Sequence, residues 1–394
     1  MKKRLIISSA LICSITVVLV FTACNKGGSN PVTETWDKQP VLPAVTYSYS
    51  EKHGIDDHQA TLGRVLFYDQ NLSVNNAVSC GSCHKQQFAF ADNVQFNKGF
   101  NGVALNRNSP SIQGIRNRFN RQLFRDQSQL PFFSAPPTLL FWDGRQTSIT
   151  DMMLNPVTNH NEMNMPDFAT LEKKLARVSY YPALFEKAYG SPEITGPKIS
   201  TALEAFIACL NTDNPNKTMD QRFDGPFFIG GGFLAPTGTL TALEEQGRQL
   251  FHTKYNCATC HDPTHGGGYD GGGGGFTTMF NIGLDPDGTG DQGQGAVTRK
   301  QAHMGVFKVP TLKNIAVTAP YMHDGRYKNL GEVIDHYSHK VAPHRNLSPV
   351  LKNMDGSPKI MDIKPAEKKA LIAFLMTLKD EDFLTSPMYA DPFN

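Results

Sequence analysis

Two short motifs of the form Cys-x-x-Cys-His constrain this chain more than any other feature. Residues 80–84 read Cys-Gly-Ser-Cys-His, and residues 257–261 read Cys-Ala-Thr-Cys-His. Two thiols at this spacing on a helical turn reach both vinyl groups of one porphyrin, and the adjacent imidazole reaches the iron. Each motif therefore predicts one covalently attached haem c with the histidine as proximal ligand. The predicted haem-binding residues are Cys80, Cys83, His84, Cys257, Cys260 and His261.

Two other uses of paired cysteines fit the sequence less well. A structural zinc site needs four ligands, and zinc ribbons usually bring their two cysteine pairs much closer together in sequence. A redox-active dithiol would be expected near a thioredoxin-like βαβ pattern, which the sequence lacks. Of the remaining cysteines, Cys209 lies on the apolar face of a predicted helix and is interpreted as a core residue.

The first residues predict export from the cytoplasm. Three basic residues at positions 2–4 precede an apolar stretch over 5–23, as in a signal peptide. The stretch ends in Thr22-Ala23-Cys24, which resembles a lipoprotein cleavage box, so Cys24 is the expected lipid attachment site. An uncleaved signal anchor is the alternative. We expect residues 1–23 to be the signal peptide, 24–50 a flexible tether, and the body a periplasmic protein held on a membrane.

The charge of the chain argues against a nucleic-acid partner. The formal net charge of the 394 residues is +2, and loss of a leader with three basic residues and no acid leaves −1. A nearly neutral net charge argues against nucleic acid as the partner, because phosphate binding usually goes with a strongly basic protein. The length suits two domains of ordinary size.

An internal duplication predicts two copies of one small helical domain. Each copy contains a G-R-x-L-F segment before its Cys-x-x-Cys-His motif, a Pro-led segment and an Asp-Gly-Arg triplet after it, and a closing helix. These pairs occupy 63–67 and 247–251, 110–115 and 310–315, 143–145 and 324–326, and 202–206 and 370–374. We therefore predict a mainly α fold with tandem cytochrome c-like haem domains at 51–235 and 236–394. A capping box that begins at Thr241 should start the helix leading to the second motif.

With these motifs, the chain resembles the bacterial di-haem cytochrome c peroxidase family, which includes the di-haem enzyme of methylamine utilisation. The resemblance covers about residues 63–378. Besides the haem motifs it rests on the segments 107–110, 141–145, 162–163, 312–315 and 318–325. It implies that the N-terminal haem handles peroxide and that the C-terminal haem receives electrons from a donor.

The resemblance also assigns roles near the first haem. Glu162 matches the distal glutamate that moves a proton between the two peroxide oxygens, although by itself it reads as a solvated acid before a helix. Trp142 matches the tryptophan between the haems, and a core role is compatible with that position. Many members carry a blocking histidine after the first motif, but residues 85–151 contain no His, Met, Cys or Tyr. We therefore expect an open first iron, with Lys85 and Lys98 as weak rival ligands.

For the second haem, the resemblance implies that Tyr337 is the sixth ligand, at a position where peroxidases of the family commonly use methionine. A tyrosine packed in the core is the alternative. Rival ligands are Met304, Met322, His336 and His339. The family also holds a calcium ion between the haems through residues that match Asn108, Thr318 and Pro320.

The leading hypothesis is a cytochrome c peroxidase that reduces hydrogen peroxide with electrons from a small donor protein, a cytochrome c or a cupredoxin. The second is a di-haem oxidase that modifies a partner protein, which ligation by Tyr337 would favour. The third is an electron carrier without enzymatic activity. A homodimer is a candidate assembly.

Overall fold

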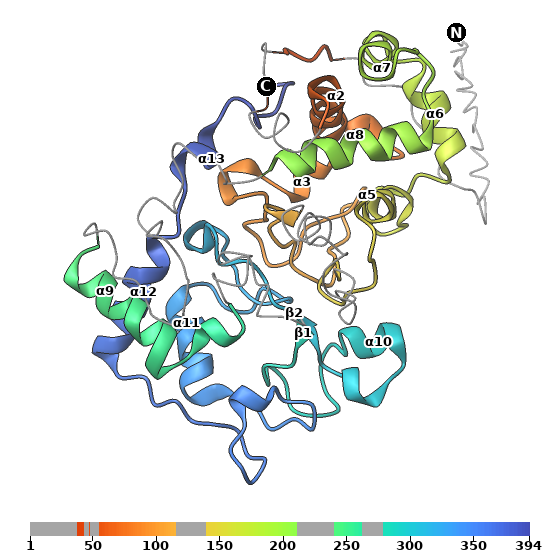
Figure 1. The fold of residues 1–394 in the computed structure, drawn as a ribbon. Helices are drawn as coiled ribbons and strands as arrows, with labels where there is room; N and C mark the ends of the chain where they lie inside the picture. The colour runs from red at the N-terminus through yellow and green to blue at the C-terminus, as the bar shows by residue number, and fades with distance from the viewer. Residues whose placement is uncertain (1–37, 43–46, 48–54, 116–138, 211–239, 262–278) are drawn as a thin grey trace, which may run out of the picture. The chain divides into compact units, whose positions relative to one another are not determined.

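The computed structural model describes residues 38–42, 47, 55–115, 139–210, 240–261 and 279–394 (Figure 1). Helices dominate this part of the chain, as predicted. Its strands are β1 (Met279–Phe280) and β2 (Phe307–Lys308), which pair antiparallel with Met279 opposite Lys308. The predicted domain boundary near residue 235, the signal peptide, Cys24 and the glycine-rich segment 266–275 lie outside the described residues.

The helices fall into an N-terminal and a C-terminal series. The first series is α2 (Asp57–Tyr68), α3 (Cys80–Cys83), α5 (Ile149–Thr158), α6 (Phe168–Leu175), α7 (Tyr181–Tyr189) and α8 (Gly196–Cys209). The second is α9 (Ala242–Gln249), α10 (Gln294–Thr298), α11 (Leu330–Asp335), α12 (Pro365–Met376) and α13 (Glu381–Thr385). Short 3-10 or π-helical turns connect them: η1 (Gln70–Leu72), η2 (Gln86–Phe88), η4 (Leu250–Lys254), η5 (Cys257–Thr259), η6 (Gln301–His303), η7 (Ile315–Val317), η8 (His336–Lys340) and η9 (Pro349–Leu351). No helix of the described residues is long and apolar enough to cross a membrane.

The same helix crossing occurs once in each half. A Cβ atom added to Gly63 of α2 would lie 1.9 Å from the carbonyl oxygen of Ala202 in α8. A Cβ atom on Gly247 of α9 would lie 1.9 Å from the carbonyl oxygen of Ala370 in α12. The glycine of each G-R-x-L-F segment thus lets the first helix of a half touch the backbone of the closing helix.

A second pair of contacts repeats this correspondence. The backbone N–H of Gly114 donates to the carbonyl of Leu210 at 2.8 Å, and that of Asn314 donates to the carbonyl of Leu378 at 2.7 Å. Gly114 and Asn314 occupy equivalent places in the two Pro-led segments and both have positive φ, 68° and 57°. Together with the helix crossings, these hydrogen bonds show that the repeated sequence segments make equivalent contacts in the two halves.

The predicted start of α9 is also correct. The Thr241 hydroxyl accepts a hydrogen bond from the backbone of Glu244, and the Glu244 carboxylate accepts one from the backbone of Thr241. This reciprocal pair satisfies two N–H groups that have no partner within the helix.

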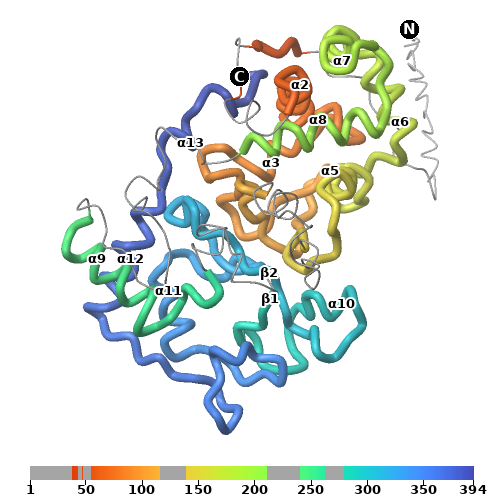
Figure 2. Tube along the Cα trace, in the orientation of Figure 1, coloured from red at the N-terminus to blue at the C-terminus, as the bar shows by residue number. Residues whose placement is uncertain are grey.

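The end of the chain packs on the N-terminal half. Phe383, Leu384 and Phe393 belong to the apolar core built mainly from α2, α7 and α8. The backbone N–H of Val41 donates to the carbonyl of Pro392 at 2.7 Å. Figure 2 shows the dark blue C-terminal trace running from α12 past α13 to the region of α2. Residues that follow the second haem domain in sequence therefore complete the core of the first.

Candidate active site

Both Cys-x-x-Cys-His motifs form a single helical turn, as predicted from their spacing. In the first, the backbone N–H of His84 donates to the carbonyl of Cys80 at 2.9 Å. In the second, the backbone N–H of His261 donates to the carbonyl of Cys257 at 3.0 Å. His84 lies directly after the end of α3, and His261 lies two residues after the end of η5.

The two histidines are held in a form that suits metal ligation. His84 Nδ1 donates to the carbonyl of Phe90 at 2.8 Å, so the protonated nitrogen is Nδ1 and Nε2 keeps its lone pair. Burial lowers the pKa of both imidazoles, to about 4 for His261, and for His84 the Phe90 carbonyl and the charge of Asp92 partly offset this effect. Both rings are therefore neutral at neutral pH.

One cavity of about 610 Å³ contains residues of both motifs on its wall. This volume lies within the range of about 300–1,000 Å³ that is typical of ligand sites. Its wall is mostly apolar and includes Phe67, Ile112, Leu140, Phe251, Leu312, Ile334 and Leu371 together with Cys80, His84, Cys257, Cys260 and His261. Thiols and neutral imidazoles beside a large apolar cavity are the donor set and surroundings that haem c requires. The residues present therefore fit two such groups.

Trp142 connects the two halves at this cavity. Its indole N–H donates to the carbonyl of Asn108 at 2.8 Å, and its own carbonyl accepts from the backbone of Lys308 at 2.8 Å. The ring lies on the cavity wall, 6.5 Å from the His323 ring, and His323 stacks on Phe307 at 3.7 Å. Trp142 thus links segments of the two halves at the cavity, and its position between the haems stays a prediction.

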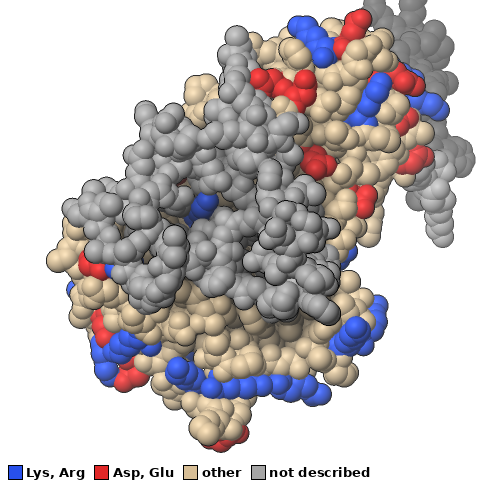
Figure 3. Space-filling view, viewed as in Figure 1, with Lys and Arg blue, Asp and Glu red and all other residues tan. Residues whose placement is uncertain are grey.

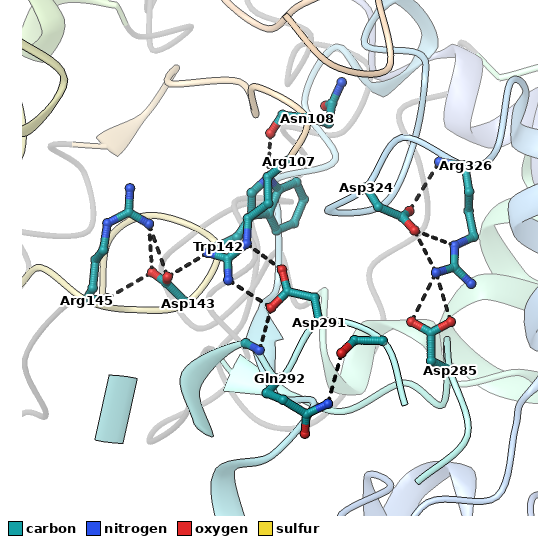
Figure 4. A network of polar contacts seen from close by, with 12 residues as sticks. Arg107, Asn108, Trp142, Asp143, Arg145, Asp285, Asp291, Gln292, Asp324 and Arg326 are labelled. Atoms are coloured by element: carbon teal, nitrogen blue, oxygen red, sulfur yellow. Dashed lines mark hydrogen bonds and ion pairs between the residues drawn. The ribbon is translucent and has the colours of Figure 1, made fainter. Parts of the chain in front are cut away.

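An arginine beside Trp142 joins the halves by ion pairs (Figure 4). Arg107 donates to Asp143 at 2.6 Å and makes a bidentate pair with Asp291 at 2.6 and 2.9 Å. Arg145 pairs with Asp143 at 3.0 Å, and Arg326 pairs with Asp324 in the equivalent triplet. Bidentate geometry fixes orientation as well as charge. Sequence reasoning did not identify Asp291, which belongs to no repeated segment.

Glu162 lies in the turn after α5 and is half-buried. Its Oε1 accepts from the Asn159 side chain at 2.8 Å, and its carbonyl accepts from the backbone of Phe100 at 2.8 Å. Burial raises the pKa of Glu162, whereas the positive charge of Arg145 lowers it. Burial also raises the pKa of the Cys80 thiol to about 12, and the Glu162 charge adds to the rise, so this carboxyl group lies near the first motif. Glu162 is not among the residues of the cavity wall.

Tyr337 lies on the cavity wall in η8. Burial raises its pKa, and the charges of Cys260 and Cys257 add to the rise, so the phenol lies close to the second motif. His336 uses both ring nitrogens within the protein, since Nε2 donates to the carbonyl of Ile282 at 3.0 Å and Nδ1 accepts from Tyr327 at 3.3 Å.

Among the other rival ligands of the second haem, Met322 lies on the cavity wall, whereas Met304 and His339 do not. Ligation by Tyr337 stays a prediction.

The three residues matched to a calcium site all lie on the same wall, namely Asn108, Thr318 and Pro320. Asn108 is held in place by its side-chain N–H group, which donates to the carbonyl of Val94 at 2.9 Å, and by its backbone N–H, which donates to the carbonyl of His323 at 2.8 Å. Neutral oxygens of this kind suit calcium. The ion itself stays a prediction.

Two methionines on the wall were missed by sequence reasoning. Met152 and Met153 of α5 contribute to the cavity, and they follow directly the interval 85–151 in which strong haem ligands were sought. A longer interval would have found them. Of the weak rivals, Lys85 is engaged by Asp92 and Asn93, each at 2.8 Å.

Known proteins share both the sequence pattern and this architecture. The sequence model for di-haem cytochrome c peroxidase matches residues 57–226, and the model for cytochrome c matches residues 244–379. The cytochrome c551 peroxidase of Pseudomonas aeruginosa is 30% identical over 289 residues, which cover 71% of this chain and 71% of the relative. The chain belongs to the di-haem cytochrome c peroxidase family.

Other similar proteins broaden the comparison within this family. The methylamine utilization protein MauG of Methylophilus methylotrophus is 27% identical over 328 residues, covering 81% of this chain and 82% of the relative. A crystal structure of a MauG-like protein associated with microbial copper homeostasis is 28% identical, with a TM-score of 0.69 over 90% of this chain and 97% of that chain. Membership in the di-haem cytochrome c peroxidase family implies two haem c groups and an oxidoreductase.

Proposed function

We propose that this protein is a peroxidase that reduces hydrogen peroxide to water with electrons from a small redox protein. The observation that carries the proposal is the convergence of both histidine motifs and Trp142 on one cavity. Trp142 is hydrogen-bonded to Asn108 in the N-terminal half and to Lys308 in the C-terminal half. An aromatic ring in this position suits electron transfer from one half to the other.

The chain's own residues would hold the reactants and move protons. When bound, the haems supply the redox chemistry of iron, with His84 and His261 as their protein ligands. Reduction of one peroxide to two water molecules breaks the O–O bond and consumes two electrons and two protons. Glu162 would take a proton from one peroxide oxygen and return it to the other, because burial raises its pKa and so brings proton exchange closer to neutral pH than for an exposed glutamate.

Several further parts of the proposal rest on the sequence. The C-terminal half would accept electrons from a small cytochrome or cupredoxin. Calcium would bind at Asn108, Thr318 and Pro320 and keep the segments between the haems in place. A lipid on Cys24 would hold the protein on the periplasmic side of a membrane.

A second candidate is an oxidase that modifies a partner protein. The position of Tyr337 on the cavity wall near Cys257 and Cys260 favours it, because an anionic oxygen ligand stabilises ferric iron and would hinder electron uptake from a donor. The similarity to MauG proteins is consistent with this alternative.

One experiment separates the two candidates. Fully oxidised holoprotein is mixed with hydrogen peroxide and a reduced small cytochrome, without prior reduction, and oxidation of the cytochrome is followed. Rapid, repeated turnover is expected for the peroxidase. A long-lived oxidised state of the haems without turnover of the cytochrome would instead favour the protein-modifying oxidase.

A further inference from the structure

A hairpin of the C-terminal half projects beside the cavity. Its two arms pair at Lys352 and Pro358, and the backbone N–H of Lys359 donates to the carbonyl of Leu351 at 2.8 Å. The hairpin is anchored to η8, because the backbone N–H groups of Met361 and Ile363 donate to the carbonyl and hydroxyl of Ser338 at 3.0 and 2.8 Å. Ser338 follows Tyr337 directly, so the hairpin is fixed to the element that faces the second motif.

Large apolar side chains on this hairpin face solvent. Val350 is 39% exposed, Ile360 is 70% exposed and Met354 is fully exposed at 107%. Single exposed apolar residues need no explanation, but three on one short hairpin are typical of a surface that another protein covers. Methionine in particular adapts its shape to a partner.

The same segment carries an excess of positive charge. Residues 340–364 contain five Lys or Arg residues and two Asp residues. Among the described residues, Lys340, Lys352 and Lys359 form no ion pair, so their charge is not cancelled locally. In Figure 3, Lys and Arg side chains lie across the lower part of the face shown, and an acidic side chain lies at its lowest tip.

The charged hairpin forms part of the cavity wall. Val350, Lys352, Lys359 and Met361 all contribute to the cavity wall, as do Tyr337 and His261. A partner bound to the hairpin would therefore lie on the side of the cavity that is lined by the second motif.

We propose that residues 340–364 form the docking surface for the electron donor, and that this donor is a small redox protein with acidic residues around an apolar contact. The inference rests on the proposed function and adds the site and the charge of the partner. The lysines would speed the encounter by attracting the acidic rim, and Val350, Met354 and Ile360 would make the close contact.

Variants of full-length holoprotein test the surface. Lys340→Glu reverses an exposed charge of this segment that is not on the cavity wall, and Met354→Ser with Ile360→Ser removes the apolar contact. The matched controls are Lys187→Glu on α7 and Val103→Ser, where Lys187 is exposed and Val103 is 60% exposed. The probes are an acidic small c-type cytochrome, a basic one, and ABTS as a small organic donor that needs no protein docking. Binding of each oxidised cytochrome is measured by sedimentation, in addition to peroxide-dependent turnover.

We expect Lys340→Glu to raise KM for the acidic cytochrome by about tenfold at low salt, with kcat, ABTS turnover and both controls unchanged. The Met354→Ser and Ile360→Ser variant should weaken binding at all salt concentrations. The docking surface would be overturned if KM and binding were unchanged in both variants. It would also be overturned if the wild-type protein bound the basic cytochrome more tightly than the acidic one. Absence of ABTS turnover would overturn the peroxidase proposal instead, and the binding measurements would still decide the docking surface.

Discussion

The carboxyl group of Glu162 combines burial with few polar partners. Among the described residues, Asn159 is the group whose side chain donates to it, and Arg145 acts on it only through its charge. Burial therefore dominates and raises the pKa of Glu162. A carboxyl group in this state exchanges protons closer to neutral pH than an exposed one, as a general acid–base group needs to.

Replacement of this carboxyl group tests its role. Glu162→Gln keeps the shape and the hydrogen bond with Asn159 but cannot exchange a proton. We expect both haems to remain attached and kcat/KM for peroxide to fall about 10²- to 10⁴-fold. Haem content is measured by absorbance, and Glu193→Gln, whose side chain is 72% exposed, serves as control. Unchanged peroxide turnover would remove Glu162 from the mechanism.

The same residue predicts a pH dependence of activity. The proton-accepting form is the carboxylate, so activity should be present above the pKa of Glu162 and decline as the pH falls through it. Because burial raises this pKa above the ordinary 4.5, the decline should begin at higher pH than for an exposed glutamate. This acid limb should be missing from the residual pH profile of Glu162→Gln. A limb that persists unchanged in the variant would point to another group.

At the scale of the helices, the close crossings of α2 with α8 and of α9 with α12 lead to a matched pair of predictions. Gly63→Ala or Gly247→Ala would push a methyl group into the backbone of the closing helix, where 1.9 Å separates the added Cβ from a carbonyl oxygen. We expect each to destabilise its half by about 1–3 kcal/mol or more, measured by thermal unfolding. Gly196→Ala is the control, because its Cβ would meet ordinary contacts at 3.5 Å. Equal stability of all three variants would contradict the close crossing.

Glu367 links α12 to η4 and predicts a pH dependence of stability. Its carboxylate accepts hydrogen bonds from Lys254 and from the Tyr255 hydroxyl at 2.7 Å, and these donors lower its pKa from 4.5 to about 2. A lowered pKa means that the stabilisation is complete above about pH 4.5 and is lost as the pH falls towards 2. Glu367→Gln should therefore be less stable than the wild type at pH 6, and the difference should shrink in acid unfolding experiments below pH 4.

Sequence patterns predicted the elements that repeat and missed those that do not. The capping box at Thr241 and the equivalence of Gly63 and Gly247 are local signals, so they can be read from neighbouring residues. Asp291 contacts Arg107 across a long sequence separation and has no counterpart in the other half. No period or motif marks such a residue, because its role depends on how the halves meet.

In the candidate site, too, local motifs could be predicted from the sequence, whereas contacts between distant segments could not. The spacing of the motifs pointed to their cysteines and histidines, and the family resemblance added Trp142. Residues of both motifs and Trp142 lie on the cavity wall, and their roles towards haem stay predictions. Met152 and Met153 reach the cavity through the path of α5, which the sequence does not reveal. The packing of Phe393 on the N-terminal half was equally hidden, because the tail follows the other domain in sequence.

For the whole molecule, this tail is a structural tie between the two haem domains. Arg64 of α2 is buried at 2% exposure, and it donates to the carbonyls of Pro387 and Met388 at 3.4 and 3.0 Å. The Tyr68 hydroxyl donates to the carbonyl of Tyr389 at 2.8 Å. Removal of the tail would leave these buried donors without their acceptors, at a cost of about 1–3 kcal/mol each and more for a charged group.

Truncation after residue 385 should therefore weaken the N-terminal half while the C-terminal half keeps its fold. Gln86, two residues after the first motif, would also lose its contact with the carbonyl of Ser386 at 2.8 Å. We expect a lower unfolding temperature and earlier proteolytic cleavage within residues 55–210, mapped by mass spectrometry. Tyr389→Phe is the control, because it keeps the aromatic contact with Phe90 and the backbone acceptor for Tyr68. If the truncated protein and the control unfold alike, the tail does not stabilise the first domain, and the two halves are held together by the ion pairs of Arg107 and the hydrogen bonds of Trp142 instead.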